Sequence, residues 1–440
     1  MTITSPLRWR EHPKLTLAAI TLIPRAALLA AAYRRATPFG ESAHDGYLQI
    51  AQDVVQHDVL GLGPHHLITR GPLFPLLLVP GVALAHPQLW NALLNLSASV
   101  ATCLLVFSAA KLLTQNVAAS FYTAAFVTLD PWLIWFVKNP MTTVTATFFV
   151  AVAVYFFVQL LLHRRLILSS LGLGASCALA ALDHPALIVL SAGFTLAILI
   201  VIAGSWRSTE KSFTIKNSTT VLATMWLAFV VVLLPYAIRN YRDVGRPVLI
   251  SDGAGLSYFM GAKRYALSPY PWANVEWPFT DVADRLHVSV SDLDVQYFTI
   301  DDRYYPELSK LAKADIESLA IHHPGFLAKR TAVMGFWFLA GDYSVSRTVA
   351  HCIFLALLAI GCWVSWKTNG WKVTAPFLVI ILPGLALHSL TMALIGHAGY
   401  AIPYVVPLAM PLAFTFMNQP VPAMSFYAAG KAGREAYGVE

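Results

Sequence analysis

Residues 141–162 have the sequence MTTVTATFFVAVAVYFFVQLLL, a run of 22 residues without Asp, Glu, Lys or Arg. A helix of that length rises about 33 Å, which is close to the hydrocarbon thickness of a lipid bilayer. An uncharged apolar run of this length is typical of a transmembrane helix. The stretch therefore predicts that the chain crosses a membrane.

Similar runs recur along the chain, whose 440 residues are 57% hydrophobic and only 12% charged. The core of a soluble protein of this size would use fewer apolar side chains. The sequence thus predicts an all-α membrane protein, built as a polytopic helical bundle. We expect about ten transmembrane helices, at residues 15–34, 88–110, 117–136, 141–162, 166–182, 184–204, 219–238, 346–366, 373–394 and 399–417.

Basic residues lie at alternate ends of these runs, as at Lys111, Arg164 and Lys367. The short opposite loops at 183–185 and 396–400 carry no Lys or Arg. Because basic loops tend to stay in the cytoplasm, we expect both termini there, in a multi-pass protein of the plasma (inner) membrane. The net charge of +7 is spread over these loops instead of being gathered on one face, so we expect no nucleic acid as a partner.

Two segments on the predicted outer face interrupt the series of helices. In the first outer loop, residues 35–87, an amphipathic part precedes a short apolar part that prolines interrupt, so we expect interfacial helices there. The second segment, residues 239–345, is a small soluble insert with about half of all acidic residues, a predicted surface helix at 308–327 and a final interfacial stretch. The chain is thus expected to divide into a membrane core at 1–238, this insert, and C-terminal helices with a cytoplasmic tail at 346–440.

A carboxylate follows the first predicted helix, in residues 41–47, which have the sequence ESAHDGY. Asp45 would lie at the mouth of the membrane, where partial desolvation raises the pKa of a carboxylic acid towards neutrality. Such a group can accept a proton from a hydroxyl nucleophile as a general base. The alternative is structural, because Asp45 could instead cap a helix that begins at Gly46.

Arginines on the predicted outer face are candidates for binding phosphate. Arg70 begins the segment RGPLFP at 70–75, and Arg239, Arg242 and Arg246 directly follow a predicted span. A guanidinium binds phosphate through paired hydrogen bonds at this depth of the membrane. The alternatives are a snorkelling anchor for Arg70, and for the others a weak topological constraint at the start of a large translocated insert.

Ionisable residues also fall inside or beside the predicted spans. Arg25 lies within the first span, and Asp183 and His184 lie near the outer end of another. Charged groups are costly in lipid, so we expect these side chains to face the bundle interior and to pair with each other or with a substrate. Asp130, near Pro131 and Trp132 within the predicted span at 117–136, could do the same or could be a solvated loop charge.

Missing motifs limit the kinds of reaction that we expect of this chain. A Walker loop, a dinucleotide-binding glycine fingerprint and a Cys or His pair at metal-ligand spacing are all missing from the sequence. We therefore expect no nucleotide hydrolysis and no divalent metal in this chain. A short outer loop with the sequence GHAGY, at 396–400, offers His397 and Tyr400 as groups that line the same outer cavity or as ordinary interface residues.

Several of these segments, taken in order, resemble the integral-membrane glycosyltransferases of the GT-C superfamily. The resemblance is to the bacterial branch that is similar to protein mannosyltransferases and lipid A aminoarabinose transferases. It covers most of the chain and depends on the order and spacing of its elements. These elements are HDGY at 44–47, RGPLFP at 70–75, PYAIRNY at 235–241, IHHP at 321–324 and GYAIP at 399–403.

The resemblance implies a sugar donor carried on a polyprenyl phosphate and transfer at the outer membrane face to an acceptor hydroxyl of a glycan, lipid or protein. Asp45 would be the catalytic base, and arginines would stabilise the charge on the departing lipid phosphate. A single displacement would invert the anomeric centre. The residues expected to contact substrate are His44, Tyr47, Arg70, Asp183, Arg239, Asn240, Arg242, His397 and Tyr400.

Three positions depart from the family pattern. The loop after the third predicted span offers Asn139, Thr142 and Thr143 where family members often carry a second acid. Gly399 stands where an arginine is common, and His184 stands in place of the arginine of an Arg-Pro pair. Two other hypotheses therefore stay open: a transporter or flippase of a lipid-linked sugar or other polar substrate, and a scaffold protein with a degenerate site.

Overall fold

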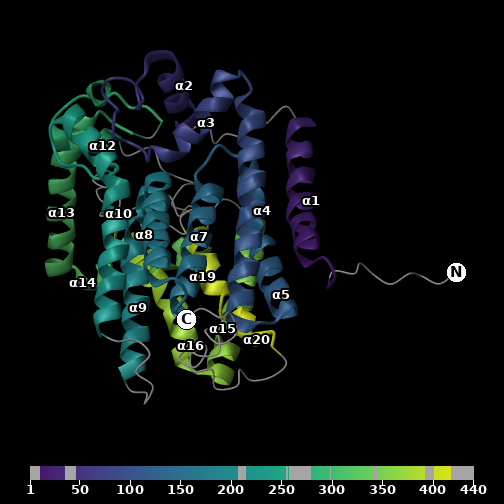
Figure 1. Cartoon of the computed structure of the whole chain (residues 1–440). Coiled ribbons are helices and arrows are strands. Elements are labelled where there is room, and N and C mark those ends of the chain that lie inside the picture. Colours follow the sequence, from purple (N-terminus) through teal and green to yellow (C-terminus); the bar gives the residue numbers. More distant parts are fainter. Residues whose placement is uncertain are drawn as a thin grey trace.

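The computed structural model describes residues 10–34, 46–206, 215–253, 256, 279–297, 299–340, 345–391 and 401–417. Nearly all regular structure in these ranges is helical, with a single isolated β-bridge between Gln296 and Thr299. The helices stand side by side as a bundle, with α1 at one side and α13 at the other (Figure 1).

The first half of the chain supplies most of the long helices. They are α1 (Pro13–Arg34), α2 (Tyr47–His57), α3 (Leu73–Ala83), α4 (Pro87–Thr114), α5 (Val117–Thr128), α6 (Pro131–Trp135), η2 (Phe136–Lys138), α7 (Thr143–Leu161), α8 (Leu166–Asp183), η3 (Pro185–Val189), α9 (Leu190–Trp206) and α10 (Ile215–Val244). The later elements are α12 (Phe279–Leu286), η5 (Val290–Leu293), η6 (Asp302–Tyr304), α13 (Tyr305–His322), α14 (Pro324–Ala340), α15 (Val345–Asn369), α16 (Trp371–Leu378), η7 (Val379–Ile381), α17 (Leu382–Thr391), η8 (Ile402–Tyr404), α19 (Val405–Ala409) and α20 (Leu412–Thr415).

Eight helices in the described ranges are long and apolar enough to cross a membrane, or nine if one bent pair counts as a single span. The prediction of an all-α membrane protein is confirmed, but two of the ten predicted spans are not single straight helices. The span at 117–136 bends by 57° between α5 and α6, where Pro131 cannot continue the helical hydrogen bonding. The last one, at 399–417, is divided into η8, α19 and α20, because Pro403, Pro407 and Pro411 each remove a backbone donor.

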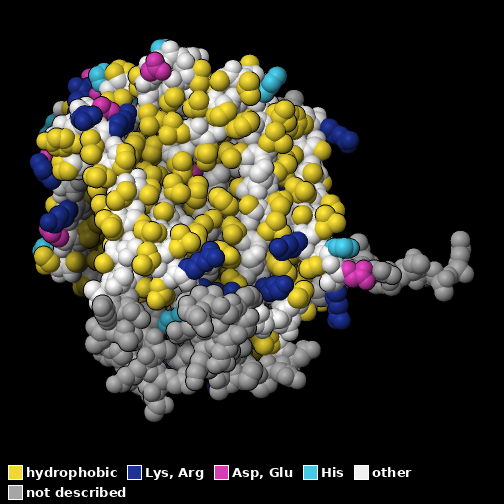
Figure 2. All heavy atoms as spheres, in the orientation of Figure 1, with side chains coloured by type: hydrophobic (Ala, Val, Ile, Leu, Met, Phe, Trp, Pro, Cys, Tyr) yellow, Lys and Arg dark blue, Asp and Glu magenta, His cyan; other side chains and the backbone are white. Residues whose placement is uncertain are grey.

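The outer surface of the bundle is apolar, as expected of a protein that faces lipid. Figure 2 shows hydrophobic side chains across the middle of one face, with Lys and Arg side chains towards its margins. On α10, the exposed fractions of Leu227 and Val231 are 62% and 56%. These side chains would be costly to expose to water and favourable in a bilayer. The described chain is therefore a multi-pass membrane protein.

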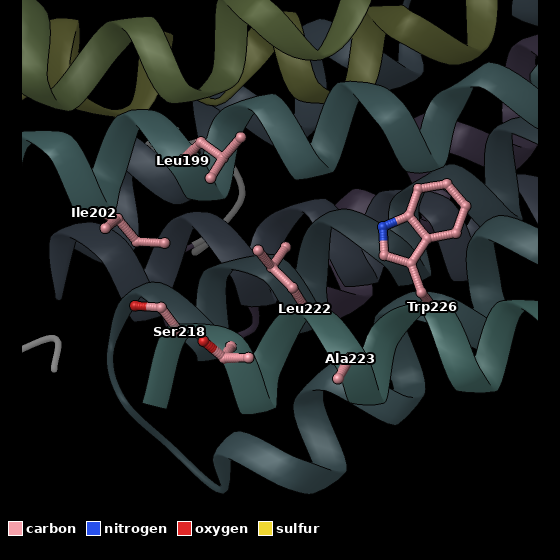
Figure 3. A pocket seen from close by; sticks show the side chains of 7 residues that line it. Leu199, Ile202, Ser218, Leu222, Ala223 and Trp226 are labelled. Atoms are coloured by element: carbon pink, nitrogen blue, oxygen red, sulfur yellow. The ribbon is translucent and has the colours of Figure 1, made fainter. Parts of the chain in front are cut away.

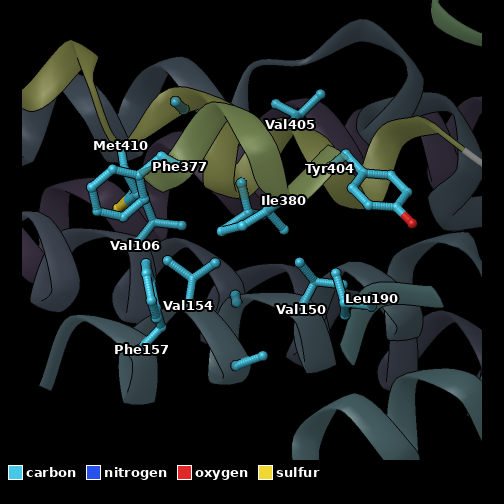
Figure 4. Close-up of a cluster of buried hydrophobic side chains, with 14 of the residues drawn as sticks. Val106, Val150, Val154, Phe157, Leu190, Phe377, Ile380, Tyr404, Val405 and Met410 are labelled. Atoms are coloured by element: carbon cyan, nitrogen blue, oxygen red, sulfur yellow. The ribbon is translucent and has the colours of Figure 1, made fainter. Parts of the chain in front are cut away.

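The core joins the two halves of the chain through α7. Phe157 of α7 lies 5.3 Å from Phe194 of α9 and 5.7 Å from Phe377 of α16, measured between ring centroids. Figure 4 shows the α7 side chains facing those of α16, η7 and η8. A Cβ atom on Gly193 would lie 2.3 Å from the carbonyl oxygen of Ile380, so only glycine permits α9 to approach η7 this closely.

The two ends of the bundle differ in composition. One end, at the top in Figure 1, carries α2, α3 and α12, and we call it the insert end. The opposite end, which we call the basic end, carries Lys111 in the last turn of α4, and Arg164 and Arg165 between α7 and α8. Helices α8 and α10 both start at the basic end and finish at the insert end.

The predicted soluble insert contains its own small hydrophobic core. The predicted surface helix at 308–327 is present as α13, which ends at His322 before Pro324. The apolar stretch predicted as a short interfacial segment is the second half of α14, a helix of 17 residues. The buried residues of this small core are Leu256, Phe279, Val282, Ala283, Leu293, Ile300, Tyr305, Leu308 and Ala312.

Candidate functional site

Six of the ten candidate site residues lie in the part of the chain that the structure describes. These are Tyr47, Arg70, Asp183, Arg239, Asn240 and Arg242. The other four, His44, Asp45, His397 and Tyr400, lie outside the described residues. All six described residues belong to elements of the insert end.

The start of α2 is tightly enclosed. Gly46 occupies the N-cap position with φ of 74°, so the N-cap considered for Asp45 falls on a residue without a side chain. A Cβ atom on Gly46 would lie 3.0 Å from Cβ of Tyr297, which adds a steric reason for glycine here. Tyr47 is buried and makes an edge-on contact with Phe74, with ring centroids 5.4 Å apart. The backbone that follows Asp45 is therefore fixed against the insert.

Arg70 reaches the same place from the first outer loop. Its guanidinium donates a hydrogen bond to the carbonyl oxygen of Tyr297 at 3.0 Å, and its Cζ lies 5.9 Å from the ring centroid of Tyr47. The side chain is only half-buried. The structure thus brings together Arg70 and the residues that directly follow Asp45 in the chain.

The next residue, Gly71, places this loop against the end of α8. A Cβ atom on Gly71 would lie 2.4 Å from the carbonyl oxygen of Leu182 and 3.0 Å from that of Asp183. Asp183 is fully buried and accepts a hydrogen bond at 2.8 Å from the hydroxyl of Thr145 on α7. Its other carboxylate oxygen has no hydrogen-bond partner among the described residues. The expectation that Asp183 faces the bundle interior is confirmed.

The region of the missing second acid contains amides and hydroxyls. The amide of Asn95 on α4 donates to the carbonyl oxygens of Val137 at 3.0 Å and Asn139 at 3.2 Å. Thr142 is hydrogen bonded to Nδ1 of His184 at 2.9 Å. The family pattern has its second acid within the loop at 136–142. In the structure, the carboxylate of Asp183 reaches Thr145, just after this loop, from the end of α8.

Arg239 and Asn240, predicted to contact substrate, hold the backbone in place. Arg239 donates to the carbonyl oxygens of Leu67 at 2.7 Å and Leu60 at 2.9 Å, and its Nε lies 2.6 Å from a carboxylate oxygen of Asp243. Asn240 is fully buried and donates to the carbonyl oxygens of Val248 and Ile250. Most N–H donors of Arg239 and both amide hydrogens of Asn240 thus have protein acceptors, which gives both side chains a structural role. Their contact with substrate stays a prediction.

Arg242 and Arg246 behave differently from each other. Arg242 is exposed on the last turns of α10 and so stays a candidate for phosphate. Arg246 forms an ion pair with Asp252 and donates to the carbonyl oxygen of Asp302 at 2.8 Å. Arg246 therefore joins the insert to α10 and is not a candidate for substrate binding.

A second set of contacts joins the first outer loop to the insert. His66 is fully buried, with Nε2 at 3.2 Å from a carboxylate oxygen of Asp294 and Nδ1 at 3.2 Å from the hydroxyl of Thr299. The backbone N–H of Leu67 donates to Asp302 at 2.6 Å. We call these interactions, together with those of Arg239 and Arg246, the insert latch. His66 and Asp294 are 228 residues apart, and the sequence carries no local signal that links them.

The enclosed position changes the acidity of two latch residues in opposite ways. Burial lowers the pKa of His66, although its hydrogen bond to Asp294 acts the other way. Burial raises the pKa of Asp302 to about 6, partly offset by backbone N–H groups of the first outer loop. Both shifts favour the neutral form, which is the form a poorly solvated group adopts at least cost.

A separate polar cluster lies inside the bundle, where α1, the α5–α6 break and α15 meet. Arg25 is buried and donates to the carbonyl oxygens of Thr21 at 3.0 Å and Thr128 at 2.9 Å. Asp130 is fully buried and caps α6 by accepting from the N–H groups of the first turn, so it is not the solvated loop charge considered above. Nδ1 of His351, which the sequence pattern missed, lies 3.6 Å from its other oxygen. We call Arg25, Asp130 and His351 the central cluster; the ion pair considered between Arg25 and Asp183 is not among the described contacts.

Comparisons with known proteins add no relative. Searches against models of protein families, curated proteins and solved structures each find no match for this chain. Within the described ranges, no group of three or more His, Cys, Asp or Glu side chains is placed to hold a metal ion. Function is therefore inferred from the residues and their geometry.

Proposed function

We propose that this protein is an integral-membrane glycosyltransferase that acts at the insert end. It would move a sugar from a polyprenyl-phosphate-linked donor to an acceptor hydroxyl of a glycan, lipid or protein, with Asp45 as the general base. The basic end would face the cytoplasm of a plasma (inner) membrane, in agreement with the positive-inside rule. The insert end would then face outward, where an anchored donor presents its phosphate near the headgroups.

The observation that carries this proposal is the contact of Arg70 with the residues that follow Asp45. Asp45 directly precedes Gly46, and consecutive Cα atoms are about 3.8 Å apart. Gly46 packs on Tyr297, whose carbonyl oxygen binds Arg70. Arg70, a cation able to bind phosphate, therefore lies beside the backbone that directly follows Asp45, which supports the assignment of both residues to one site.

The chemistry is a single displacement. The acceptor oxygen forms a bond to the anomeric carbon while its proton passes to the Asp45 carboxylate. The bond from the anomeric carbon to the phosphate oxygen breaks, and its electron pair leaves with the lipid phosphate. Arg70 and the exposed Arg242 would stabilise that charge, which grows in the transition state. Arg239 and Asn240 would act indirectly, by holding the backbone of the site.

The proposal is tested by transfer of radiolabelled sugar from a panel of polyprenyl-phosphate sugars into membrane acceptors. We expect Asp45→Asn to reduce transfer at least about 100-fold, as is typical when a general base is removed. Asp58→Asn is the matched control, because Asp58 is an exposed carboxylate of the same loop with φ of 56°, a conformation that asparagine adopts readily. Equal transfer by the wild type and Asp45→Asn would contradict the assignment of the base.

The central cluster favours a second candidate function, a transporter or flippase of a lipid-linked sugar or other polar substrate. Broken helices near the membrane midplane are common in transporters, and the 57° break lies beside Asp130. Buried ionisable residues within a membrane often mark a translocation pathway. Movement of a fluorescent polyprenyl-phosphate lipid across proteoliposomes would support this function over transfer if it is kept in Asp45→Asn and lost in Asp130→Asn protein whose unfolding transition shows that it is still folded.

A further inference from the structure

Two open grooves flank the first turns of α10 at the basic end, far from the candidate site. One, of about 390 Å³, lies between α9 and α10 and is lined mainly by apolar side chains such as Leu199, Leu222 and Trp226 (Figure 3). The other, of about 550 Å³, lies between the first turn of α8 and α10. We call the second one the α8–α10 groove. Its lining includes Arg165, Leu166, Ile167, Leu168, Thr220 and Val221.

The α8–α10 groove combines apolar walls with one cation. Ile167 and Leu168 are exposed by 60% and 53%, which is costly in water and suited to contact with an acyl chain. Arg165 is the charged residue among those that line the groove, and its side chain is exposed. An apolar channel with a cation at one end is complementary to a lipid whose headgroup is anionic.

The backbone holds Arg165 in this position. Arg165 and His163 adopt φ of 45° and 53°, in the left-handed region that non-glycine residues seldom occupy. The turn between α7 and α8 is fixed by hydrogen bonds from the N–H of Arg164 to the carbonyl oxygen of Gln159 at 2.9 Å, and from Ser169 to the carbonyl oxygen of Arg164 at 2.9 Å.

Arg165 is also the N-cap of α8, and its side chain makes no capping hydrogen bond. The first turn of α8, residues 166–168, lines the groove beside it. First-turn N–H groups lack intrahelical acceptors and carry partial positive charge, which adds to the charge of Arg165. Both sources of positive charge thus lie at one mouth of the same apolar channel.

We propose that the α8–α10 groove binds an anionic phospholipid, with its phosphate at Arg165 and one acyl chain along the exposed Ile167 and Leu168. The proposal concerns the end of the bundle opposite to the candidate site and holds whether or not the protein transfers sugar. The lipid would act as a structural ligand of the basic end. Its binding would depend on headgroup charge and on the presence of an acyl chain.

The test is native mass spectrometry of the full-length protein with phosphatidylglycerol or phosphatidylcholine added to the micelles. We expect Arg165→Gln to weaken phosphatidylglycerol binding about fivefold, the loss typical of one interfacial cation. Arg164→Gln is the matched control, since it removes the same charge from the neighbouring exposed position that does not line the groove. Its effect should stay below about twofold.

A second pair of variants tests the apolar part of the groove. Thr220→Trp should obstruct the α8–α10 groove, whereas Thr219→Trp projects into the other groove and should leave phosphatidylglycerol binding unchanged. Both positions are exposed, so the variants are expected to fold, and their unfolding temperatures would be compared with the wild type. Equal binding of both lipids, equal loss in Arg164→Gln and Arg165→Gln, full competition by inorganic phosphate, or no effect of Thr220→Trp would each overturn the proposal.

Discussion

The insert latch and the central cluster both contain buried ionisable residues, but they stabilise them in different ways. In the latch, Asp294 keeps a side chain that is 41% exposed beside the buried His66, and many contacts cross between the two segments. In the central cluster, Arg25, Asp130 and His351 are each 1% exposed or less, among apolar helices. Water can replace a lost partner at the insert end, whereas inside the bundle it has poor access. The same type of substitution should therefore have different costs in the two regions.

The largest effect is expected for Asp130→Asn in the central cluster. The buried imidazole of His351 would lose the carboxylate that lies 3.6 Å from its Nδ1, and removing one partner of a buried pair typically costs about 3–5 kcal/mol. Thermal or chemical unfolding in detergent measures this cost, with Asp58→Asn as a control at an exposed carboxylate. The double variant His351→Gln with Asp130→Asn should recover at least about 1 kcal/mol relative to the sum of the single variants. Strict additivity would show that the two residues do not interact.

An intermediate effect is expected for Arg239→Gln in the insert latch. This substitution removes two hydrogen bonds to carbonyl oxygens of the first outer loop and the pair with Asp243, which together contribute about 1–3 kcal/mol. The change should be local, so hydrogen exchange at residues 58–71 is the appropriate measurement. Arg242→Gln, one helical turn away and exposed, should leave this exchange unchanged. Equal exchange in Arg239→Gln and the wild type would contradict the structural role assigned to Arg239.

The smallest effect is a change in how the stability of the latch depends on pH. The pKa of His66 is lowered by folding, so its contribution is complete above about pH 6.5 and declines as pH falls below that value. The pKa of Asp302 is raised from 3.8 to about 6, so its contribution declines as pH rises through that interval.

These opposite signs can be separated by two variants. Between pH 4 and 6, Asp302→Asn should make latch stability rise more steeply with pH than in the wild type, and His66→Gln should make it fall. Each change in slope is at most about 1.4 kcal/mol per pH unit, because one proton is involved. Hydrogen exchange of residues 60–71 across this range provides the measurement. Parallel pH profiles for both variants would show that neither group titrates as the geometry indicates.

Most of the fold was predictable because length and composition decide whether a helix can cross a membrane. The charge-free run at 141–162 gives α7, and seven other predicted spans correspond to long helices. The two exceptions contain proline at positions where a continuous helix would need a donor, so their signal was present in the sequence. At 117–136 the apolar run predicted one continuous span, although Asp130 and Pro131 within this run start a new helix.

The candidate site was less predictable because the same residue type can serve either a ligand or the backbone. The cost of an acid in lipid correctly indicated that Asp183 faces inward. No comparable rule distinguishes an arginine that binds phosphate from one that binds carbonyl oxygens, and the acceptors of Arg239 lie 172 and 179 residues earlier in the chain. His66 and Asp294 meet only after the first outer loop and the insert have folded together.

The length of α10 has a consequence for the membrane itself. Its 30 residues rise about 45 Å, while the hydrocarbon region of a typical bilayer is about 30 Å thick. The first turns of α10 lie at the level of Arg165, so the part of the helix that exceeds the hydrocarbon thickness extends out at the insert end. This part carries Arg239 and Asn240 beyond the hydrocarbon. A thicker bilayer would draw these residues towards lipid and a thinner one would expose more of the helix, at a cost that grows with each ångström of mismatch. Bilayer thickness is thus a variable that acts directly on the position of the insert latch.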